Sequence, residues 1–266
     1  KNFVRKYLLK DRLAELVRSI GQWVFRHDPF FIIGQNRASA ILVCNREAFN
    51  ALPKKWQKKG YFFPVNGVSV NDLSRTFKKE NNNGNFLILT AGKLLKIKGF
   101  DLVVRAFGVF GEKAKDAKLV IAGEGPELAN LQKMVDNLRL DGRVIFEGWL
   151  SRERLLQKMA NCDIFLFLSL RDGGGNVVIE AMSMGKPVVC FDIAGPGFHV
   201  DEKCGIKIKP ESPEQAVVDI ATALEKLYSD NKLREELGRG AGEKAEKEYN
   251  WDKLGDKLFE IYNKVF

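Results

Sequence analysis

Three consecutive glycines, residues 173–175, form the segment of the sequence with the clearest chemical meaning. They follow an apolar run, residues 164–168, and precede a stretch of helical length, residues 177–184. Three glycines in a row cost much conformational entropy on folding, so they indicate that a ligand approaches the main chain closely; an ordinary strand-to-helix turn is the alternative. The first amides of a helix favour an anion such as diphosphate. The candidate anion-binding amides belong to Gly173, Gly174, Gly175, Asn176 and Val177.

Two carboxylates accompany this glycine turn. Asp172 lies in the loop before the glycines, and Glu180 lies within the helix expected after them, so the two side chains could face two ends of one ligand. A carboxylate accepts hydrogen bonds from hydroxyl groups in pairs, which suits recognition of ribose or hexose as well as acid–base chemistry. Considered alone, Glu180 could equally be a solvated helix residue.

Other candidate residues follow two earlier apolar runs. Lys93 and Lys98 come after Gly92, and their positive charge could neutralise a diphosphate, although lysines taken alone are usually exposed surface residues. Glu147 and Gly148 precede Trp149, whose ring could stack on a nucleotide base or pack inside the protein.

Histidine and cysteine are too sparse for a metal centre. His27 and His199 are the two histidines, and no CxxC pair occurs, so we expect no metal site. His199 could act as a catalytic base, or it could cap or pack against a helix start. We expect the cysteines to be reduced, small hydrophobic residues in a cytoplasmic compartment. They are Cys44, Cys162, Cys190 and Cys204.

The elements that position these residues alternate between short β-rich runs and helical stretches. This alternation predicts parallel βαβ units in an α/β fold with a Rossmann-like doubly wound sheet, whose ligands bind at the carboxyl ends of the strands. We expect three helices in residues 213–266, the last beginning near Trp251. The expected strands are 86–91, 119–122, 144–147, 164–168, 188–191 and 206–208, and the helices between them are 101–111, 127–138, 152–160 and 177–184.

The first quarter of the chain carries the excess of basic charge. The net charge is +9, and residues 1–60 hold 13 Lys and Arg against 4 Asp and Glu. Apolar residues in 5–26 recur at three- and four-residue steps, which predicts an amphipathic helix that either lies on a membrane surface or packs against a larger domain. A strand at 40–45, a helix at 46–52, a strand at 61–65 and an exposed loop at 78–85 follow. Basic charge alone does not make nucleic acid an expected partner.

On these motifs, residues 40–266 resemble the family 4 retaining glycosyltransferases of the GT-B fold. In that family two glutamates separated by seven residues flank a glycine-rich turn, and Asp172 and Glu180 occupy those places, with Asp instead of the usual Glu. The segment TAGKLLKIKGFDLVVRAF resembles the family's strand, glycine turn and basic pair, with Lys93 where relatives more often carry Arg. The segments IAGEGPE and VIFEGWLSRERL are two shorter matches.

The resemblance implies a site for a nucleoside-diphosphate sugar. Lys93, Lys98 and Asp172 would take part in catalysis: the lysines would stabilise the diphosphate and Asp172 would contact the donor hexose. Glu180 would bind the nucleotide ribose. The remaining donor contacts would come from Gly92, the loop of Glu147, Gly148 and Trp149, and the glycine turn with Asn176 and Val177.

The resemblance also implies a division of the chain. Residues 1–66 would be a remnant of an N-terminal acceptor domain with the interdomain strand, residues 67–250 the donor-binding domain, and residues 251–266 a helix crossing back toward the missing N-terminal domain. We therefore expect exposed apolar surface on residues 1–66, the tail of the acceptor domain.

The implied activity is that of a retaining hexosyltransferase in polysaccharide biosynthesis. It would move a sugar to a glycan or lipid-linked acceptor, with no metal and no cofactor besides the donor, and the fragment alone would be inactive. A non-catalytic nucleotide-binding or regulatory module of the same fold is the alternative. We expect a cytoplasmic protein, with peripheral contact at the inner face of the membrane left open.

Overall fold

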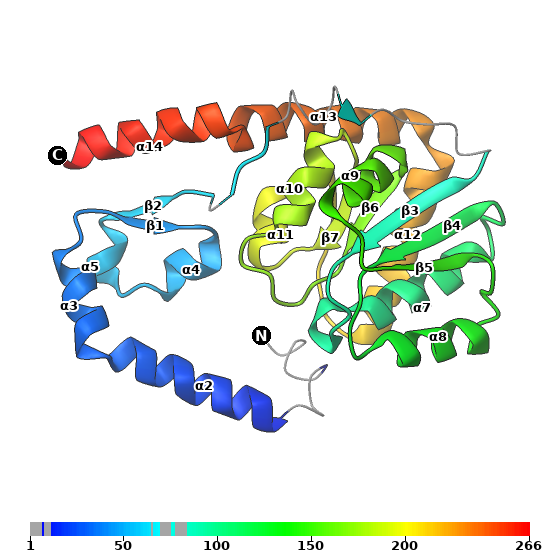
Figure 1. Cartoon of the computed structure of the whole chain (residues 1–266), viewed down its shortest axis with the longest axis horizontal. Helices are drawn as coiled ribbons and strands as arrows, with labels where there is room; N and C mark the ends of the chain where they lie inside the picture. Colours follow the sequence, from blue (N-terminus) through cyan, green and yellow to red (C-terminus); the bar gives the residue numbers. More distant parts are fainter. Residues whose placement is uncertain (1–6, 8–11, 65, 70–75, 78–83) are drawn as a thin grey trace.

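A computed structural model of the chain describes residues 7, 12–64, 66–69, 76–77 and 84–266 (Figure 1). Its larger body contains a six-stranded parallel sheet with the order β5-β4-β3-β6-β7-β8. The order reverses between β3 and β6, and doubly wound sheets bind their ligands at the carboxyl ends of the strands at such a point. The strands are β3 (Phe86–Ala91), β4 (Ala117–Ala122), β5 (Val144–Gly148), β6 (Ile164–Phe167), β7 (Val188–Phe191) and β8 (Gly205–Ile208).

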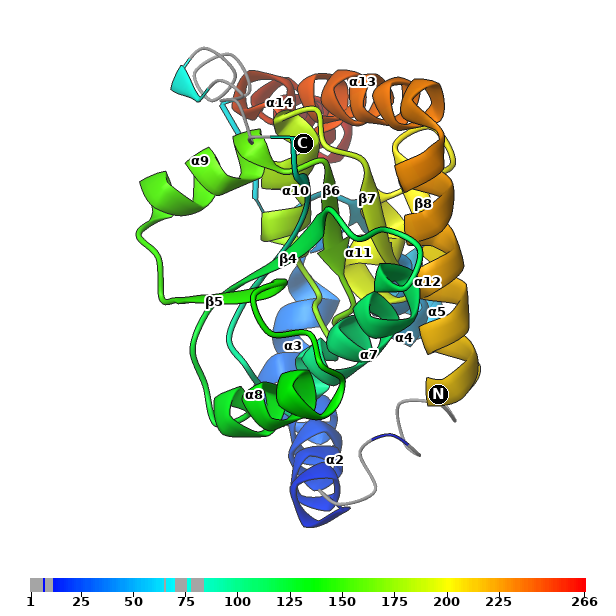
Figure 2. The same ribbon diagram turned by 90° about the vertical axis from the view of Figure 1, so that its right-hand side faces the viewer.

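Helices cover both faces of this sheet (Figure 2). Neighbouring strand residues point to opposite faces, so Ile88 packs in one hydrophobic core and Leu89 in the other. On the Ile88 side lie α7 (Phe100–Gly111), α8 (Leu128–Asn137) and α12 (Pro213–Ser229). On the Leu89 side lie α9 (Arg152–Asn161), α10 (Asn176–Ser183) and α13 (Asn231–Tyr249). These two cores fix the positions of the loops that carry the candidate site.

The N-terminal part of the chain, residues 12–64, lies beside this body. It pairs two short parallel strands, β1 (Ile41–Val43) and β2 (Gly60–Phe62). The last helix, α14 (Trp251–Val265), extends from the body alongside this part, as Figure 1 shows. The N-terminal helices are α2 (Arg12–His27), α3 (Pro29–Arg37), α4 (Arg46–Ala51) and α5 (Lys54–Gln57).

Two chain segments connect the N-terminal part and α14 to the body, and they are hydrogen-bonded to each other. The amide of Val68 donates to the carbonyl oxygen of Tyr249 at 2.8 Å, and the amide of Trp251 donates to the carbonyl oxygen of Val68 at 3.3 Å. The side chain of Asn250 accepts from the amide of Asp252 and caps α14. The two connections therefore run side by side.

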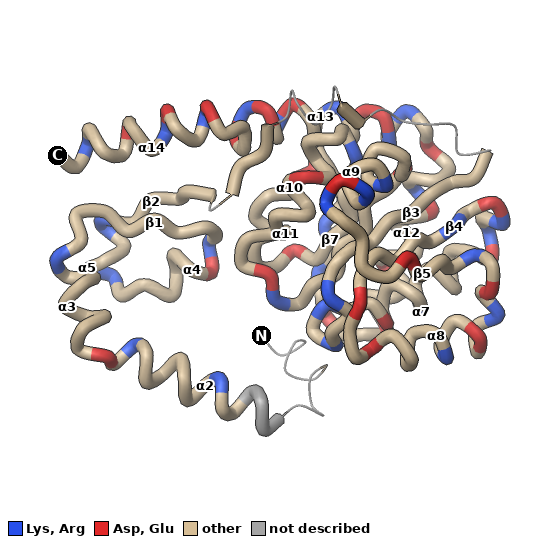
Figure 3. The backbone as a smooth tube through the Cα atoms, in the orientation of Figure 1, with Lys and Arg blue, Asp and Glu red and all other residues tan. Residues whose placement is uncertain are grey.

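Exposed apolar side chains occur on both α2 and α14, and those on α2 agree with the expectation for residues 1–66. Figure 3 shows acidic and basic residues interspersed over the body. Within the described part of the chain, no helix combines the length and the apolar character needed to cross a membrane. The exposed apolar side chains include Leu16, Val17, Ile20, Val24, Leu258, Phe259 and Tyr262.

The expected doubly wound sheet is confirmed, with small shifts at the ends of elements. The strand expected at 40–45 ends at Val43, because Asn45 turns the chain and caps α4 through the amide of Ala48. The strand expected at 61–65 is described as Gly60–Phe62, and Val65 lies outside the described residues. The start of the helix expected at 5–26 and most of the loop expected at 78–85 also lie outside them.

Candidate functional site

The loop after β3 is held against the loop after β4 and the end of β6. A Cβ atom on Gly123 would lie 1.9 Å from the carbonyl oxygen of Gly92, so only glycine allows these two loops to touch. A short 3-10 helix, η2 (Lys96–Lys98), follows, and Gly99 adopts a left-handed conformation beside Leu168. This packing brings Lys98 next to the loop that leaves β6.

Lys98 and the glycine turn meet at one carboxylate. The Nζ atom of Lys98 lies 2.7 Å from Oδ2 of Asp172, and the amide of Gly175 donates to Oδ1 of Asp172 at 2.8 Å. The side chains of Lys98 and Asp172 are both partly buried, with exposed fractions of 21% and 22%. The structure therefore brings Lys98 and the amide of Gly175 to the same carboxylate, with Asp172 between them.

The glycine turn packs against the loop and the helix that follow β7. Gly175 is left-handed, with φ of 59°, and α10 begins directly after it. A Cβ atom on Gly195 would lie 2.6 Å from the carbonyl oxygen of Gly173. Gly195 belongs to the short helix α11 (Ala194–His199). The close approach explains glycine at position 195, because a side chain there would displace the turn.

Glu180 borders a hollow of about 250 Å³ at the start of α10. Its Oε1 atom lies 3.1 Å from Nη2 of Arg152, whose side chain is mostly exposed. Burial raises the pKa of Glu180, and the nearby Arg152 guanidinium opposes that rise. Because Glu180 is largely buried, the interpretation as a solvated helix residue does not fit. The hollow is lined by Asn66, Gly67, Val68, Arg152, Asn176, Ile179, Glu180 and Trp251.

At the end of β5, Glu147 and, after Gly148, Trp149 place their side chains in two directions. Glu147 forms an ion pair with Lys158 of α9 and lines a second hollow of about 550 Å³, which shares no lining residue with the hollow at Glu180. Trp149 is 72% exposed, so its ring does not pack inside the protein, which was the alternative to stacking on a base. Gly148 accepts from the amide of Gly123 at 2.7 Å. The structure therefore brings the main chain of this segment, but not the Glu147 side chain, near the loop of Gly92.

Lys93 is an exposed side chain in the loop after Gly92. Within the described part of the chain it forms no hydrogen bond or ion pair, in contrast to Lys98. Asn176 accepts from Nδ2 of Asn66 at 2.6 Å and lies with Glu180 around the smaller hollow. Val177 is partly buried on the first turn of α10 and packs against the core on the Leu89 side of the sheet.

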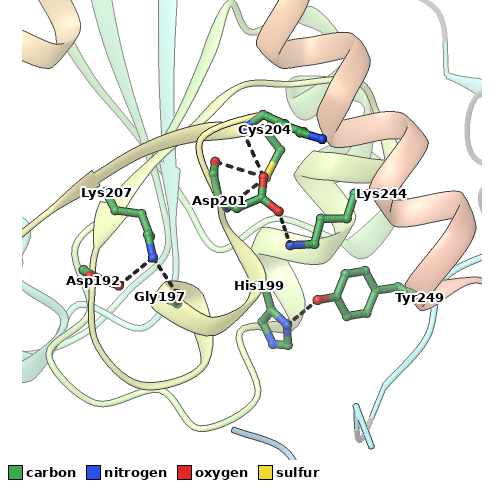
Figure 4. A network of polar contacts seen from close by, with 9 residues as sticks. Asp192, Gly197, His199, Asp201, Cys204, Lys207, Lys244 and Tyr249 are labelled. Atoms are coloured by element: carbon green, nitrogen blue, oxygen red, sulfur yellow. Dashed lines mark hydrogen bonds and ion pairs between the residues drawn. The ribbon is translucent and has the colours of Figure 1, made fainter. Parts of the chain in front are cut away.

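His199 is buried and supports the glycine turn. Its Nε2 atom lies 2.8 Å from the carbonyl oxygen of Gly174, and its Nδ1 atom lies 2.9 Å from the hydroxyl of Tyr249, a contact drawn in Figure 4. Burial lowers the pKa of His199 to about 4, so the ring is neutral at pH 7. A carbonyl only accepts, so Nε2 carries the proton and Nδ1 accepts from Tyr249. Both ring nitrogens are engaged, which excludes the catalytic-base interpretation and supports packing.

Three further residues join the site without having been predicted to do so. Asn45 donates from Nδ2 to the carbonyl oxygen of Gly173 at 3.0 Å, although the two lie 128 positions apart. Arg152 pairs with Glu180, and Asn66 reaches Asn176. An asparagine before a helix signals a cap, but no local pattern shows the distant carbonyl that its amide meets.

No group of three or more His, Cys, Asp and Glu side chains within the described ranges is arranged to hold a metal ion. The four cysteines are free, and all but Cys44 are buried.

The sequence matches a known family over most of this body. Residues 73–244 match the family described as glycosyl transferases group 1. Alpha-D-kanosaminyltransferase from Streptomyces kanamyceticus is 28% identical over 181 residues, which cover 67% of this chain and 46% of that protein. The chain spans about half the length of the curated relatives it matches.

Solved structures share the fold. The pneumococcal O-GlcNAc transferase GtfA, in complex with UDP and GlcNAc, has a TM-score of 0.72 and 20% identity, covering 90% of this chain and 47% of that one. The C-terminal domain of the glycosyl transferase group 1 family protein LpcC from Francisella tularensis has a TM-score of 0.57 and 25% identity. That comparison covers 71% of this chain and 96% of the LpcC domain.

Proposed function

Since this chain belongs to the group 1 glycosyl transferases, we propose that it is the donor-binding half of a retaining glycosyltransferase of family 4. The whole protein would transfer a sugar from a nucleoside-diphosphate sugar to a glycan or lipid-linked acceptor, with retention of anomeric configuration. The observation that carries the proposal is the meeting of Lys98, Asp172 and the Gly175 amide beyond the carboxyl ends of β3 and β6, where the strand order reverses.

The diphosphate of the donor would bind where Asp172 now meets Lys98. A diphosphate competes with the carboxylate for the same two donors, the Lys98 ammonium and the Gly175 amide. Lys93 is exposed in the adjacent loop and would add a second positive charge. Preorganised positive charge and amides stabilise the negative charge that develops on a leaving diphosphate, which is the main catalytic contribution we assign to this chain.

Asp172 and Glu180 would recognise the two sugars of the donor. Once displaced from Lys98, Asp172 would contact the transferred hexose, with a reach one methylene shorter than that of glutamate. Glu180 would accept from the ribose hydroxyls in the smaller hollow, and Arg152 at its mouth would help to hold the carboxylate ionised. The main chain of Gly148 and the exposed ring of Trp149 would contact the base.

The relatives support this assignment of ligands. The pneumococcal transferase holds UDP and GlcNAc, and the LpcC domain is described as a C-terminal domain, which agrees with a donor-binding domain at residues 67–250. Residues 1–66 would belong to the acceptor side and residues 251–266 would return to it. We expect this chain alone to bind the donor and to transfer nothing.

Calorimetric titration tests donor binding directly. UDP, GDP and ADP are titrated into the chain and into Lys98→Ala, with Lys113→Ala as the control because its exposed ion pair with Glu225 lies on other elements. We expect one nucleotide to bind the chain and Lys113→Ala equally. Lys98→Ala should bind it at least tenfold more weakly, since a partly buried positive charge is lost. Absence of binding to all three would refute the donor site.

A non-catalytic module of the same fold is the second candidate function. It is favoured by the ion pair between Lys98 and Asp172, which lies where we propose the diphosphate, and by Asp172 and Lys93 at places where the resembled family usually has Glu and more often has Arg. Release of nucleoside diphosphate by the full-length protein in the presence of donor separates the two. An enzyme releases it with turnover, whereas a module binds without release of new product.

Peripheral membrane contact would explain the exposed apolar face of α2. Leu16, Val17, Ile20 and Val24 are all exposed, and basic residues flank them, in a protein that we place in the cytoplasm. Co-sedimentation with vesicles containing anionic lipid tests this contact, with neutral vesicles as the control. Loss of binding in an Ile20→Glu variant would support it, and equal recovery in the supernatant with both vesicle types would contradict it.

A further inference from the structure

Three successive carbonyl groups of the glycine turn are each held by a donor from another part of the chain. The carbonyl oxygen of Asp172 accepts from the amide of Gly195 at 2.8 Å. The carbonyl oxygen of Gly173 accepts from Nδ2 of Asn45 at 3.0 Å. The carbonyl oxygen of Gly174 accepts from Nε2 of His199 at 2.8 Å. Each donor comes from a different loop or helix end.

Holding these carbonyls also fixes the directions of the amides. In a trans peptide the N–H of the next residue points away from the C=O, and no cis peptide occurs among the described residues. The amide of Gly175 accordingly points away from His199 and reaches Oδ1 of Asp172, the carboxylate that also meets Lys98. The amides of Gly173 and Gly174 donate to no partner within the described part of the chain.

External support is needed because glycine does not fix its own backbone. Glycine populates positive and negative φ with similar ease, so a run of three could rotate its peptide planes at little energetic cost. A rotated peptide would present a carbonyl oxygen to the diphosphate in place of an amide. Electrostatic repulsion would then replace a charge-assisted hydrogen bond.

We propose that Asn45 and His199 are positioning residues. They hold the carbonyls of Gly173 and Gly174, and so direct the N–H groups of the next residues, Gly174 and Gly175, at the donor diphosphate. The inference rests on the proposed function of the site. Neither residue touches the ligand: each acts through the carbonyl that it binds. Asn45 approaches from the N-terminal part and His199 from α11, so the turn is held from both sides.

Both residues are themselves held in place. Asn45 is 5% exposed, and its Oδ1 atom accepts from the amide of Ala48 at 2.8 Å, which leaves Nδ2 aimed at Gly173. His199 is 1% exposed, and the hydroxyl of Tyr249 at Nδ1 keeps the proton on Nε2, facing Gly174. The contact with Ala48 therefore directs the Asn45 amide toward Gly173, and the contact with Tyr249 directs the His199 N–H toward Gly174.

Aromatic and polar contacts seat the N-terminal part next to the turn. The rings of Phe62 and Phe198 stack with centroids 5.5 Å apart, and Phe62 also stacks on Phe49 at 5.0 Å. The amide of Ala194 donates to Oε1 of Glu47 at 3.3 Å. These contacts bring Asn45 within reach of Gly173 and give the acceptor side of the chain a direct influence on the diphosphate turn.

Binding measurements on matched variants test the inference. UDP, GDP, ADP and inorganic pyrophosphate are titrated by calorimetry into the full 266-residue chain, His199→Ala, His199→Gln and Asn45→Ser. Serine keeps the cap on α4 but has no amide for Gly173, and glutamine can donate to Gly174 as Nε2 does. Ser212→Ala, which removes the cap of α12 far from the turn, is the control for lost stability.

We expect His199→Ala and Asn45→Ser to bind the tightest probe about tenfold more weakly, and His199→Gln to recover most of that loss. Ser212→Ala should bind as the parent chain does. If His199→Ala and Asn45→Ser both bind with the affinity of the parent chain, the inference is overturned while the donor site remains intact. A His199→Gln variant as weak as His199→Ala, or a Ser212→Ala variant weakened equally, would also overturn it. A parent chain that binds none of the four probes would remove the proposed function and the inference together.

Discussion

The ion pair between Lys98 and Asp172 gives the candidate site two states. In the present state each charge is satisfied by the other, and the Gly175 amide adds a third contact to the carboxylate. A diphosphate bound as we propose would bring more negative charge to the same donors and would displace the carboxylate. The side chain that we assign to the hexose is therefore also a competitor of the diphosphate.

Asp172→Asn should separate these two roles. The asparagine keeps an oxygen for the Gly175 amide but removes the negative charge, so nucleoside diphosphate should bind up to ~tenfold more tightly. The intact nucleoside-diphosphate sugar should gain less, because its hexose loses the carboxylate. Calorimetry with both ligands measures the difference. Weaker binding of the nucleoside diphosphate itself would contradict displacement.

His199 should make stability depend on pH. Its pKa is about 4 in the folded chain and about 6.5 in an unfolded one. Between these values the unfolded state binds the proton and the folded state does not, so stability is complete above pH 6.5 and falls as the pH is lowered toward 4. The loss should reach roughly 3 kcal/mol.

Urea denaturation at several pH values in this range measures that loss. His199→Gln serves as the comparison because Glu180 and Asp201, whose pKa values are also shifted, titrate in both proteins. The parent chain should lose more free energy of unfolding than the variant as the pH falls. Parallel curves would show that His199 titrates normally.

At the scale of the elements, α13 shows how glycine allows close packing. A Cβ atom on Gly238 would lie 2.4 Å from the carbonyl oxygen of Gly185, and one on Gly240 would lie 2.0 Å from that of Lys203. Helix propensity disfavours glycine in the middle of a helix, so its presence here follows from contact with the loops after α10 and before β8. The helix lies against main chain, with no space for side chains at these two positions.

Two glycine-to-alanine variants should therefore have opposite effects. Gly240→Ala in α13 should destabilise the chain by about 2 kcal/mol or more, because a backbone carbonyl must move. Gly255→Ala in α14 meets no atom within 4 Å and should stabilise it by up to ~1 kcal/mol. Chemical denaturation of both variants measures the difference. Similar changes in both would show that propensity alone governs these sites.

The order of strands and helices was predictable from sequence, but much of the site was not. Short apolar runs between glycine loops fixed the number and direction of the strands in the main sheet, and their boundaries differed by at most two residues. Periodicity reports only on nearby residues, so it could not bring Asn45 to Gly173 or Arg152 to Glu180. It also could not show that Asp172 would pair with Lys98, since that contact depends on how the loops after β3 and β6 meet.

At the scale of the whole molecule, apolar surface on α2 and α14 should make the isolated chain associate with itself. Phe259 and Tyr262 of α14 are exposed, as are Trp23 and Phe25 of α2. Sedimentation velocity over a range of concentrations should show species larger than a monomer at high concentration. Phe259→Glu should shift the distribution toward monomer. A chain that stays monomeric throughout would show that these faces do not drive association.

The paired crossing at Val68 and Tyr249 also limits how the molecule can move. Sliding or separating the two segments would break the hydrogen bonds that Val68 forms with Tyr249 and Trp251, whereas a rotation about these bonds would leave them intact. We therefore expect any movement of the N-terminal part toward or away from α11 to be a rotation about this crossing. That rotation would carry Asn45 to or from Gly173, so the angle about the crossing would determine whether the glycine amides are held ready for an anion.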